Sequence, residues 1–200
     1  MFTAEETTAL LGELDARLRR RGLAASIFVV GGAAIAASKA RRDRVTEDVD
    51  AVTRDAVVLD EAKALARERG LPENWLNPNA GMWMPPLAPG VLDRPARPGL
   101  RVTYADDGFL LATKLIAQRA KDADDVVALA DRLGLTTATP QQLEAHIRRY
   151  YTDQATLEFI VDGDDVDREI TLLAEDASRM LIRTATVDEA VPSRDPEPGD

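Results

Sequence analysis

The chain has 200 residues, 45% of them hydrophobic, so it can bury a substantial core, and we expect one domain, or one with a small helical addition. It contains no cysteine, which excludes a disulfide framework and a thiolate zinc site. No apolar run approaches the roughly 18 residues of a membrane span, and the N-terminus lacks a signal-peptide pattern. We therefore expect a cytoplasmic protein with no membrane partner.

The net charge of −10 argues against a nucleic-acid partner, but its distribution weakens that argument. Basic and acidic residues balance up to residue 150, so the acidic excess is C-terminal. Two clusters of basic side chains in the balanced part could hold a phosphate backbone, although arginines at helix ends are commonly only solvated. These clusters are Arg17, Arg19, Arg20 and Arg21, and Lys39, Arg41, Arg42 and Arg44.

The chain begins with a predicted amphipathic helix, in which Thr3 and Glu6 form a capping box and leucines follow at helical spacing. The next predicted element is a strand over residues 27–30, which ends at Gly31-Gly32 before a run of helix formers. Two glycines between a strand and a helix let the backbone approach a ligand closely and present N–H groups to a phosphate. The same pair is also common in tight turns.

Two acidic residues, Asp48 and Asp50, lie on a predicted strand over residues 48–52. Alternate side chains of a strand share one face, so the two carboxylates should lie about 6–7 Å apart along the chain. Paired carboxylates repel unless a cation lies between them, and hard oxygen ligands suit Mg²⁺ or Mn²⁺ bound to a nucleotide's phosphates. Such a pair can also be no more than two solvated acids.

A helix is predicted over residues 59–69 and a strand over residues 100–104, with an irregular segment of residues 71–99 between them. That segment contains seven prolines and is too long for an ordinary connection. We expect its tryptophans, Trp75 and Trp83, to anchor the loop to the core. The alternative is that they provide an aromatic surface on which a base stacks.

The helix that follows this strand contains Lys114 among apolar residues, and an ammonium in that position must reach solvent or meet an anion. Asp122 and Asp125 come further along the same segment. In an unbroken helix, Asp125 would lie on the face of Lys114 but about three turns away. We assign Asp122 to capping of a new helix.

A further helix begins at Pro140, where Thr139 and Gln142 form a capping box, and the last predicted helix covers residues 168–182. The acidic, proline-rich end of the chain is predicted to be disordered. The expected organisation is therefore a core over residues 1–135, a helical extension over residues 136–185 and a disordered tail over residues 186–200.

Two segments carry a family resemblance. Gly31-Gly32 followed by R-V-T-E-D-V-D, which contains Arg44, Thr46, Asp48 and Asp50, resembles motif I of the polymerase-beta-like nucleotidyltransferases. The segment from L-L-A-T-K to K-D-A-D-D-V is similar to the later motifs of this superfamily, and among its members the chain resembles the small bacterial AbiEii and MenT toxin-type enzymes. The resemblance implies an α+β nucleotidyltransferase fold, with a small mixed sheet flanked by helices and a C-terminal helical part.

The resemblance also implies a role for each matching residue. Asp48 and Asp50 would hold Mg²⁺ or Mn²⁺ on a nucleoside triphosphate, and Asp125 would act as a base or a further metal ligand. Lys114 would grip the triphosphate. The Thr46 hydroxyl corresponds to a modification site by which an antitoxin silences these toxins. The residues implied to bind the nucleotide are Gly31, Gly32, Arg44, Thr46 and Lys114.

The implied reaction is transfer of a nucleoside monophosphate to an acceptor hydroxyl, and the toxin-like members point to the 3′ end of tRNA and to a cognate antitoxin. An aminoglycoside-type antibiotic or a protein is an alternative acceptor, and a catalytically silent binding module is an alternative function. One feature departs from the wider superfamily, because the predicted strand L-R-V-T-Y supplies no third carboxylate. The number of metal ions therefore stays open.

Overall fold

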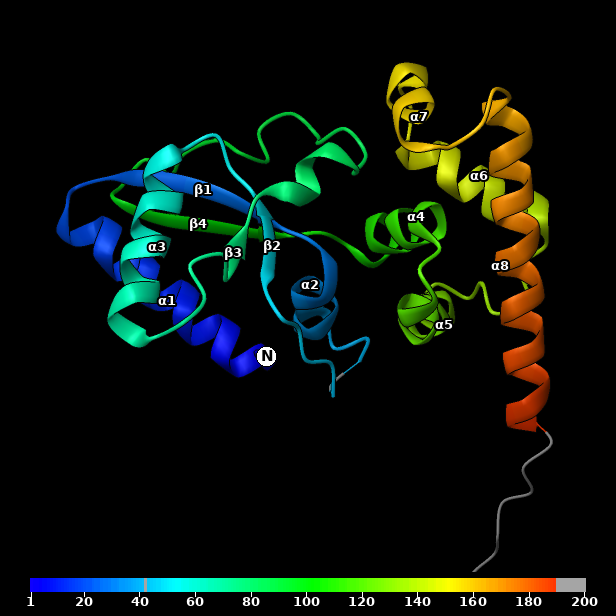
Figure 1. Ribbon diagram of the computed structural model, residues 1–200, viewed down its shortest axis with the longest axis horizontal. Helices are drawn as coiled ribbons and strands as arrows, with labels where there is room; N and C mark the ends of the chain where they lie inside the picture. The colour runs from blue at the N-terminus through cyan, green and yellow to red at the C-terminus, as the bar shows by residue number, and fades with distance from the viewer. Residues whose placement is uncertain (42, 190–200) are drawn as a thin grey trace, which may run out of the picture.

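The computed structural model describes residues 1–41 and 43–189 and contains a small mixed sheet with helices packed against it (Figure 1). The strands lie in the order β3-β2-β1-β4; β1 is antiparallel to β2 and parallel to β4, and β2 is parallel to β3. Their bounds are β1 Ala24–Val29, β2 Val49–Val52, β3 Leu76–Asn77 and β4 Gly99–Tyr104. The expected α+β class with a small mixed sheet is thus confirmed.

Helices form the rest of the described structure. In Figure 1, α1, α2 and α3 lie beside the sheet, whereas the helices from α4 onward gather on the opposite side of the molecule, with the long α8 outermost. The α-helices are α1 Ala4–Arg20, α2 Gly31–Ser38, α3 Ala56–Arg69, α4 Asp107–Ala117, α5 Ala123–Arg132, α6 Pro140–Tyr150, α7 Gln154–Ile160 and α8 Val166–Glu189. Two short 3₁₀ helices are η1 Asn79–Met82 and η2 Ala120–Asp122.

Both predicted capping boxes are present. The Thr3 hydroxyl accepts from the backbone N–H of Glu6 while the Glu6 carboxylate accepts from the N–H of Thr3, and Thr139 and Gln142 repeat this arrangement at α6. These reciprocal bonds satisfy backbone donors that a helix start otherwise leaves free. Local chemistry therefore fixes where α1 and α6 begin.

The helix that follows β4 is broken, and a new helix begins at Ala123, immediately after Asp122. α4 ends at Ala117 because Gln118 takes a left-handed conformation, with φ of 39°, and η2 then leads into α5. The predicted capping role of Asp122 is wrong, because its side chain makes no capping hydrogen bond at the start of α5. The break folds α5 back on α4 and brings Asp122 and Asp125 toward Lys114.

The C-terminal end also differs from the expected boundary. α8 continues to Glu189, so helix extends into the first residues of the tail that was predicted to be disordered. The rest of that tail, residues 190–200, and Arg42 of the second basic cluster lie outside the described residues. Within the described part, no helix is long and apolar enough to cross a membrane.

The core is continuous from the sheet to the C-terminal helices. α4 joins the two sides, since it packs on α2 as well as on α5, α6 and α8. Its buried leucines, Leu110, Leu111 and Leu115, belong to the same cluster as Leu14 of α1 and Ile27 of β1. Burial of such side chains stabilises a fold by roughly 1.5–3 kcal/mol each. The position of α4 relative to the sheet is therefore strongly determined.

The irregular segment of residues 71–99, which includes β3 and η1, is fixed to this core near both ends. Trp75 is fully buried, and its indole N–H donates to the Ala62 carbonyl at 2.9 Å, as expected for an anchor. At the other end, the buried Asp55 carboxylate accepts from Arg94, and the Ser26 hydroxyl donates to the Leu92 carbonyl at 2.6 Å. The middle of the segment, which contains η1, is thereby held next to β2.

Candidate functional site

The glycine turn predicted from the sequence lies directly against one of the paired acids. α2 begins at Gly31, and the N–H of Val30 donates to the Asp50 carbonyl of the neighbouring strand at 2.9 Å. A Cβ atom on Gly31 would lie 2.6 Å from Oδ2 of Asp50, and φ of Gly31 is +62°. Only glycine combines this conformation with this approach. The start of α2 and the Asp50 carboxylate therefore form one continuous surface.

Replacement of Gly31 tests this close approach. We expect Gly31→Ala to destabilise the fold by about 2–3 kcal/mol, because about 1 kcal/mol comes from the left-handed conformation and the rest from the contact with Asp50. Gly22→Ala is the matched control, because φ of Gly22 is +67° but nothing lies within 4 Å of its added Cβ. Equal losses of unfolding free energy in urea would show that the contact with Asp50 contributes nothing.

Asp50 and Asp48 have the electrostatics of a cation site. Burial, together with the charge of Asp48, raises the pKa of the Asp50 carboxyl from 3.8 to about 6, although Arg119, Lys114 and Lys121 oppose this shift. Nothing among the described residues hydrogen-bonds to the Asp50 carboxylate, whereas Asp48 accepts from Asn77 at 2.9 Å. Two close carboxylates with free oxygen atoms fit a divalent ion whose remaining ligands are water or phosphate oxygens.

Asn77 was missed in the sequence because β3 is only two residues long and gives no periodic signal. β3 pairs with β2 in a register that places Asn77 opposite Asp50, and from there its amide reaches Asp48. This bond orients the Asp48 carboxylate beside its partner acid. Asn77 is thus part of the support of the acidic pair.

Arg44 and Thr46 lie against the second glycine, Gly32. A Cβ on Gly32 would lie 3.0 Å from Oγ1 of Thr46 and 3.3 Å from Nη2 of Arg44. The Thr46 hydroxyl is mostly buried and donates to the Asp48 carbonyl at 2.8 Å, and its backbone pairs with Phe2. Thr46 therefore holds the backbone that presents Asp48.

Lys114 is almost completely buried, with 4% of its side chain exposed, and its ammonium is neutralised locally. Its Nζ atom donates to Oδ1 of Asp122 at 2.6 Å and lies 3.2 Å from Oδ2 of Asp125. The sequence had indicated that this lysine meets an anion or reaches solvent, and it meets two carboxylates. The break at Gln118 makes both contacts possible.

Asp125 is completely buried and is surrounded by cations. Its Oδ1 atom lies 3.1 Å from Arg41 and 3.2 Å from Arg44, and Lys114 contacts the other oxygen. Within residues 1–41 and 43–189, no group of three or more His, Cys, Asp and Glu side chains is arranged to hold a metal. The position of Asp125 favours a role as the anion that joins α5 to α4 and to the segment before β2.

Arg119 is a further residue of this region that the sequence analysis missed. It donates to the buried Asp122 at 2.7 Å, while half of its own side chain stays exposed. Burial alone would raise the pKa of Asp122, but the hydrogen bonds and charges of Lys114 and Arg119 outweigh it and hold that pKa below its usual value. Arg119 is thereby held near Asp50, and its positive charge opposes the rise in the pKa of the Asp50 carboxyl.

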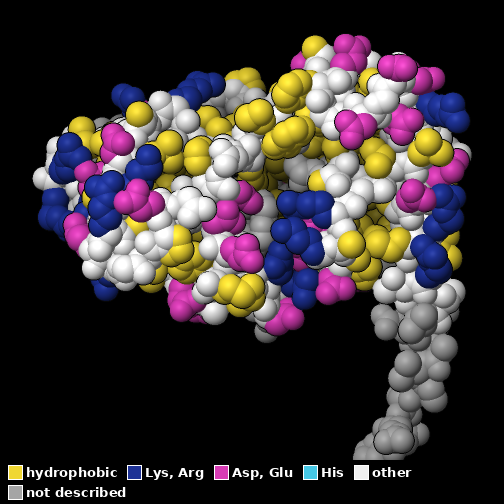
Figure 2. All heavy atoms as spheres, viewed as in Figure 1, with side chains coloured by type: hydrophobic (Ala, Val, Ile, Leu, Met, Phe, Trp, Pro, Cys, Tyr) yellow, Lys and Arg dark blue, Asp and Glu magenta, His cyan; other side chains and the backbone are white. Residues whose placement is uncertain are grey.

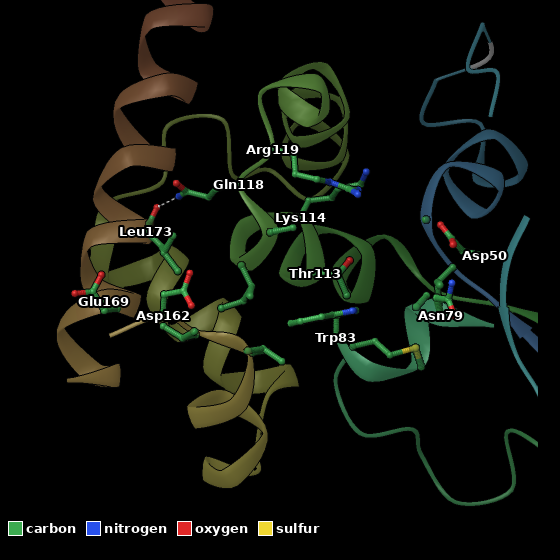
Figure 3. Close-up of a pocket in the computed structure, with 18 residues that line it drawn as sticks. Asp50, Asn79, Trp83, Thr113, Lys114, Gln118, Arg119, Asp162, Glu169 and Leu173 are labelled. Carbon is green, nitrogen blue, oxygen red and sulfur yellow. Dashed lines mark hydrogen bonds between the residues drawn. The ribbon is translucent and has the colours of Figure 1, made fainter. Parts of the chain in front are cut away.

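Gly31, Asp50, Lys114 and Arg119 line a cavity of about 670 Å³ between the sheet and the C-terminal helices. In Figure 3, Asp50 lies at one side, Asp162 and Glu169 lie at the other, and Lys114, Arg119 and Trp83 lie between them. A volume in this range suits a ligand of nucleotide or drug size. The cavity therefore has a cationic middle, one end formed by Asp50 and a second acidic wall.

The surface around the cavity has two electrostatic regions. Figure 2 shows Lys and Arg side chains gathered in the middle of one face, between the sheet and the helical part, and Asp and Glu side chains over the upper helical part. A polyanion is attracted to the first region and repelled by the second. The charge distribution therefore defines the side from which each kind of ligand approaches.

The described residues thus define an α+β protein in which Gly31, the adjacent Asp50 carboxylate and the cationic side chains of Lys114 and Arg119 line one cavity. The chain matches no protein-family model, and comparisons with curated proteins and with solved structures gave no significant match.

Proposed function

We propose that this protein is a metal-dependent nucleotidyltransferase with a polymerase-beta-like fold, which transfers a nucleoside monophosphate from a triphosphate to an acceptor hydroxyl. The observation that carries the proposal is the contact between Gly31, at the start of α2, and Asp50. It places backbone N–H donors and the positive end of a helix beside paired carboxylates, as binding of a metal-bound phosphate requires.

The acidic pair has the chemistry to hold Mg²⁺ or Mn²⁺. When bound there, the ion would neutralise phosphate charge as an acceptor hydroxyl attacks the α-phosphorus and pyrophosphate leaves. Asp48 and Asp50 would supply its carboxylate ligands, and Asn77 would keep Asp48 oriented. With no third carboxylate beside this pair among the described residues, the site fits one firmly held ion better than two.

Lys114 and Arg119, the two cationic residues of the cavity, have different roles. Because Lys114 is already paired with two carboxylates, it acts mainly by holding Asp122 and Asp125 in place. Arg119 is more exposed and lines the cavity, so it is the better candidate to contact phosphate oxygens. This assignment moves the triphosphate-gripping role from Lys114, for which the family resemblance implied it, to Arg119.

The 3′ end of tRNA is the first candidate acceptor, with the protein acting as the toxin of a toxin–antitoxin pair. This rests on the resemblance of the two motif segments to toxin-type enzymes and is supported by the Lys and Arg side chains beside the cavity (Figure 2). RNA would approach from this basic side, since the surface of α7 and the start of α8 is acidic. A cognate antitoxin is the implied partner.

A cationic small molecule of the aminoglycoside type is the second candidate acceptor. Asp162 and Glu169 line the side of the cavity opposite Asp50 (Figure 3). Their carboxylates would attract amino groups and repel phosphates. An acceptor bound there would have its hydroxyls directed toward the paired acids. This candidate acceptor is positively charged, whereas tRNA is a polyanion.

A labelling experiment tests the proposal and separates these acceptors. The protein is incubated with Mg²⁺ and each α-phosphate-labelled triphosphate in turn, with total tRNA in one series and an aminoglycoside mixture in another. We expect label in one acceptor class with the wild type, and none with Asp50→Asn. Asp60→Asn, which changes an exposed acid of α3, is the matched control and should retain full transfer. Absence of label in both series and in protein would contradict the proposed function.

A further inference from the structure

Two exposed aromatic rings meet at the edge of the cavity. Trp83, which follows η1, is 54% exposed, and Phe159 of α7 is 63% exposed. Their ring centroids are 5.8 Å apart with an angle of 27° between the planes, so the rings are stacked. Figure 2 shows hydrophobic side chains gathered on this part of the surface. Large exposed apolar patches on a protein commonly mark binding sites.

The indole of Trp83 is carried on a firmly held backbone. The carbonyl of Trp83 accepts from the hydroxyl of Tyr151 at 2.9 Å, and its N–H donates to Ala80 at 3.1 Å. Tyr151 is itself buried, and burial raises the pKa of its phenol. The exposed position of Trp83 is therefore built into the fold, although the same segment buries Trp75 completely.

The two faces of the indole have different surroundings. Trp83 lines the cavity that contains Asp50, whereas Phe159 lines the neighbouring groove with Pro85 and Met82. The phenyl ring of Phe159 thus packs on the face of the Trp83 indole that lies toward the groove. In Figure 3, Trp83 lies in the cavity below Thr113 and Lys114, between Asp50 and the acidic wall. The other face of the indole is left to the cavity.

We propose that this face of Trp83 is a stacking platform for a nucleobase, with Phe159 as its support. The inference rests on the proposed function, because a ligand whose phosphates lie at Gly31 and Asp50 would extend its base into the same cavity, toward Trp83. A neutral planar base gains from stacking and is not repelled by Asp162 and Glu169. The base belongs either to the nucleoside triphosphate or to the unpaired end of an acceptor RNA.

Tryptophan fluorescence and calorimetry with the full chain test this platform. Trp75 is buried and Trp83 is the only other tryptophan, so quenching by a ligand reports on Trp83. The ligands are the four nucleoside triphosphates, a short RNA with an unpaired 3′ end, and inorganic tripolyphosphate, which has no base; each is added with Mg²⁺. We expect quenching by a triphosphate or by the RNA, whichever supplies the base, and none by tripolyphosphate.

The variants then separate stacking from general binding. We expect Trp83→Leu to weaken binding of the base-bearing ligand about tenfold and to leave tripolyphosphate binding unchanged, while Trp83→Phe keeps most of the affinity. Met82→Ala removes another exposed apolar side chain of the same region and should have no effect; thermal melts confirm that each variant is folded.

Unchanged affinity of Trp83→Leu for every base-bearing ligand would overturn the platform, as would the absence of any base-bearing ligand that binds the wild type. The first outcome leaves the proposed function standing, because label transfer is measured separately. The second outcome contradicts both proposals, since a nucleotidyltransferase must bind a triphosphate. Conversely, a protein that transfers no label but binds a nucleobase through Trp83 would retain the platform and lose the proposed enzyme activity.

Discussion

Asp50→Asn is expected to reduce nucleotidyl transfer by about 1,000-fold or more, because it removes one of the two carboxylates that would hold the metal ion and several kcal/mol of transition-state stabilisation with it. The same substitution should stabilise the protein without metal above pH 6 by about 1–2 kcal/mol. Burial and the charge of Asp48 oppose ionisation of Asp50 in the fold, and the amide carries no charge. Loss of activity together with a gain in stability is typical of a functional carboxylate.

The pH dependence of this gain has a definite sign. The pKa of Asp50 is raised from 3.8 to about 6 in the fold, so below about pH 3 the carboxyl is protonated in both folded and unfolded chains. Between about pH 4 and 6 the unfolded chain releases the proton first, and the stability of the wild type falls as the pH rises. We therefore expect the advantage of Asp50→Asn to be absent below about pH 3 and nearly complete above pH 6 in urea unfolding.

Magnesium supplies the control for this prediction. Mg²⁺ should raise the melting temperature of the wild type, because it binds the folded state, and should have little effect on Asp50→Asn. Asp60→Asn, on the exposed surface of α3, should respond to pH and to Mg²⁺ as the wild type does. A wild-type melting temperature insensitive to millimolar Mg²⁺, with or without a triphosphate, would argue against a metal site at Asp48 and Asp50.

Asp125→Asn is expected to be the most destabilising of these substitutions. The amide has the same shape but cannot neutralise Lys114, Arg41 and Arg44, and a buried charge without its partner costs about 3–5 kcal/mol. Because Lys114 keeps Asp122, and the two arginines are partly exposed, we expect a value near the lower limit. For a chain of this length the melting temperature should fall by about 6–12 °C, measured by calorimetry.

Asp124→Asn is a close control for Asp125→Asn. Asp124 is the preceding residue and also lies near Arg41, at 3.6 Å, but its side chain is 80% exposed. We expect its substitution to change the unfolding free energy by less than about 0.5 kcal/mol. If Asp125 were instead a catalytic base or a metal ligand, Asp125→Asn would melt close to the wild type and lose transfer when assayed well below its melting temperature.

The sequence itself determined the local features of this protein. The starts of α1 and α6 follow from capping boxes whose groups are only three residues apart, so no distant contact is needed to fix them. Short apolar runs predicted β1 and β2, alternation predicted β4, and the glycine pair predicted the turn at Gly31. The short range of these interactions is the reason that they can be predicted from residue order.

The tertiary structure decided how the site is assembled. β3 and η1 have no periodic pattern of their own, and only pairing with β2 brings Asn77 to Asp48 and η1 to the cavity. α7 likewise gives no strong signal, and it becomes informative only where Phe159 meets Trp83. These contacts join residues distant in the chain, so their formation depends on the packing of the whole core.

The segment after β4 shows the difference most clearly. Its residue types predicted a helix with a lysine among apolar residues and two later aspartates, and all three lie in the site region. Their roles, however, depend on the left-handed conformation of Gln118, a residue type that rarely takes it. Packing of α5 against α4, together with the attraction between Lys114 and two buried carboxylates, outweighs the preference of that residue for helix. The sequence thus determined which charged groups are present, and only the tertiary structure decided that Asp122 and Asp125 neutralise Lys114 and leave Arg119 exposed at the cavity.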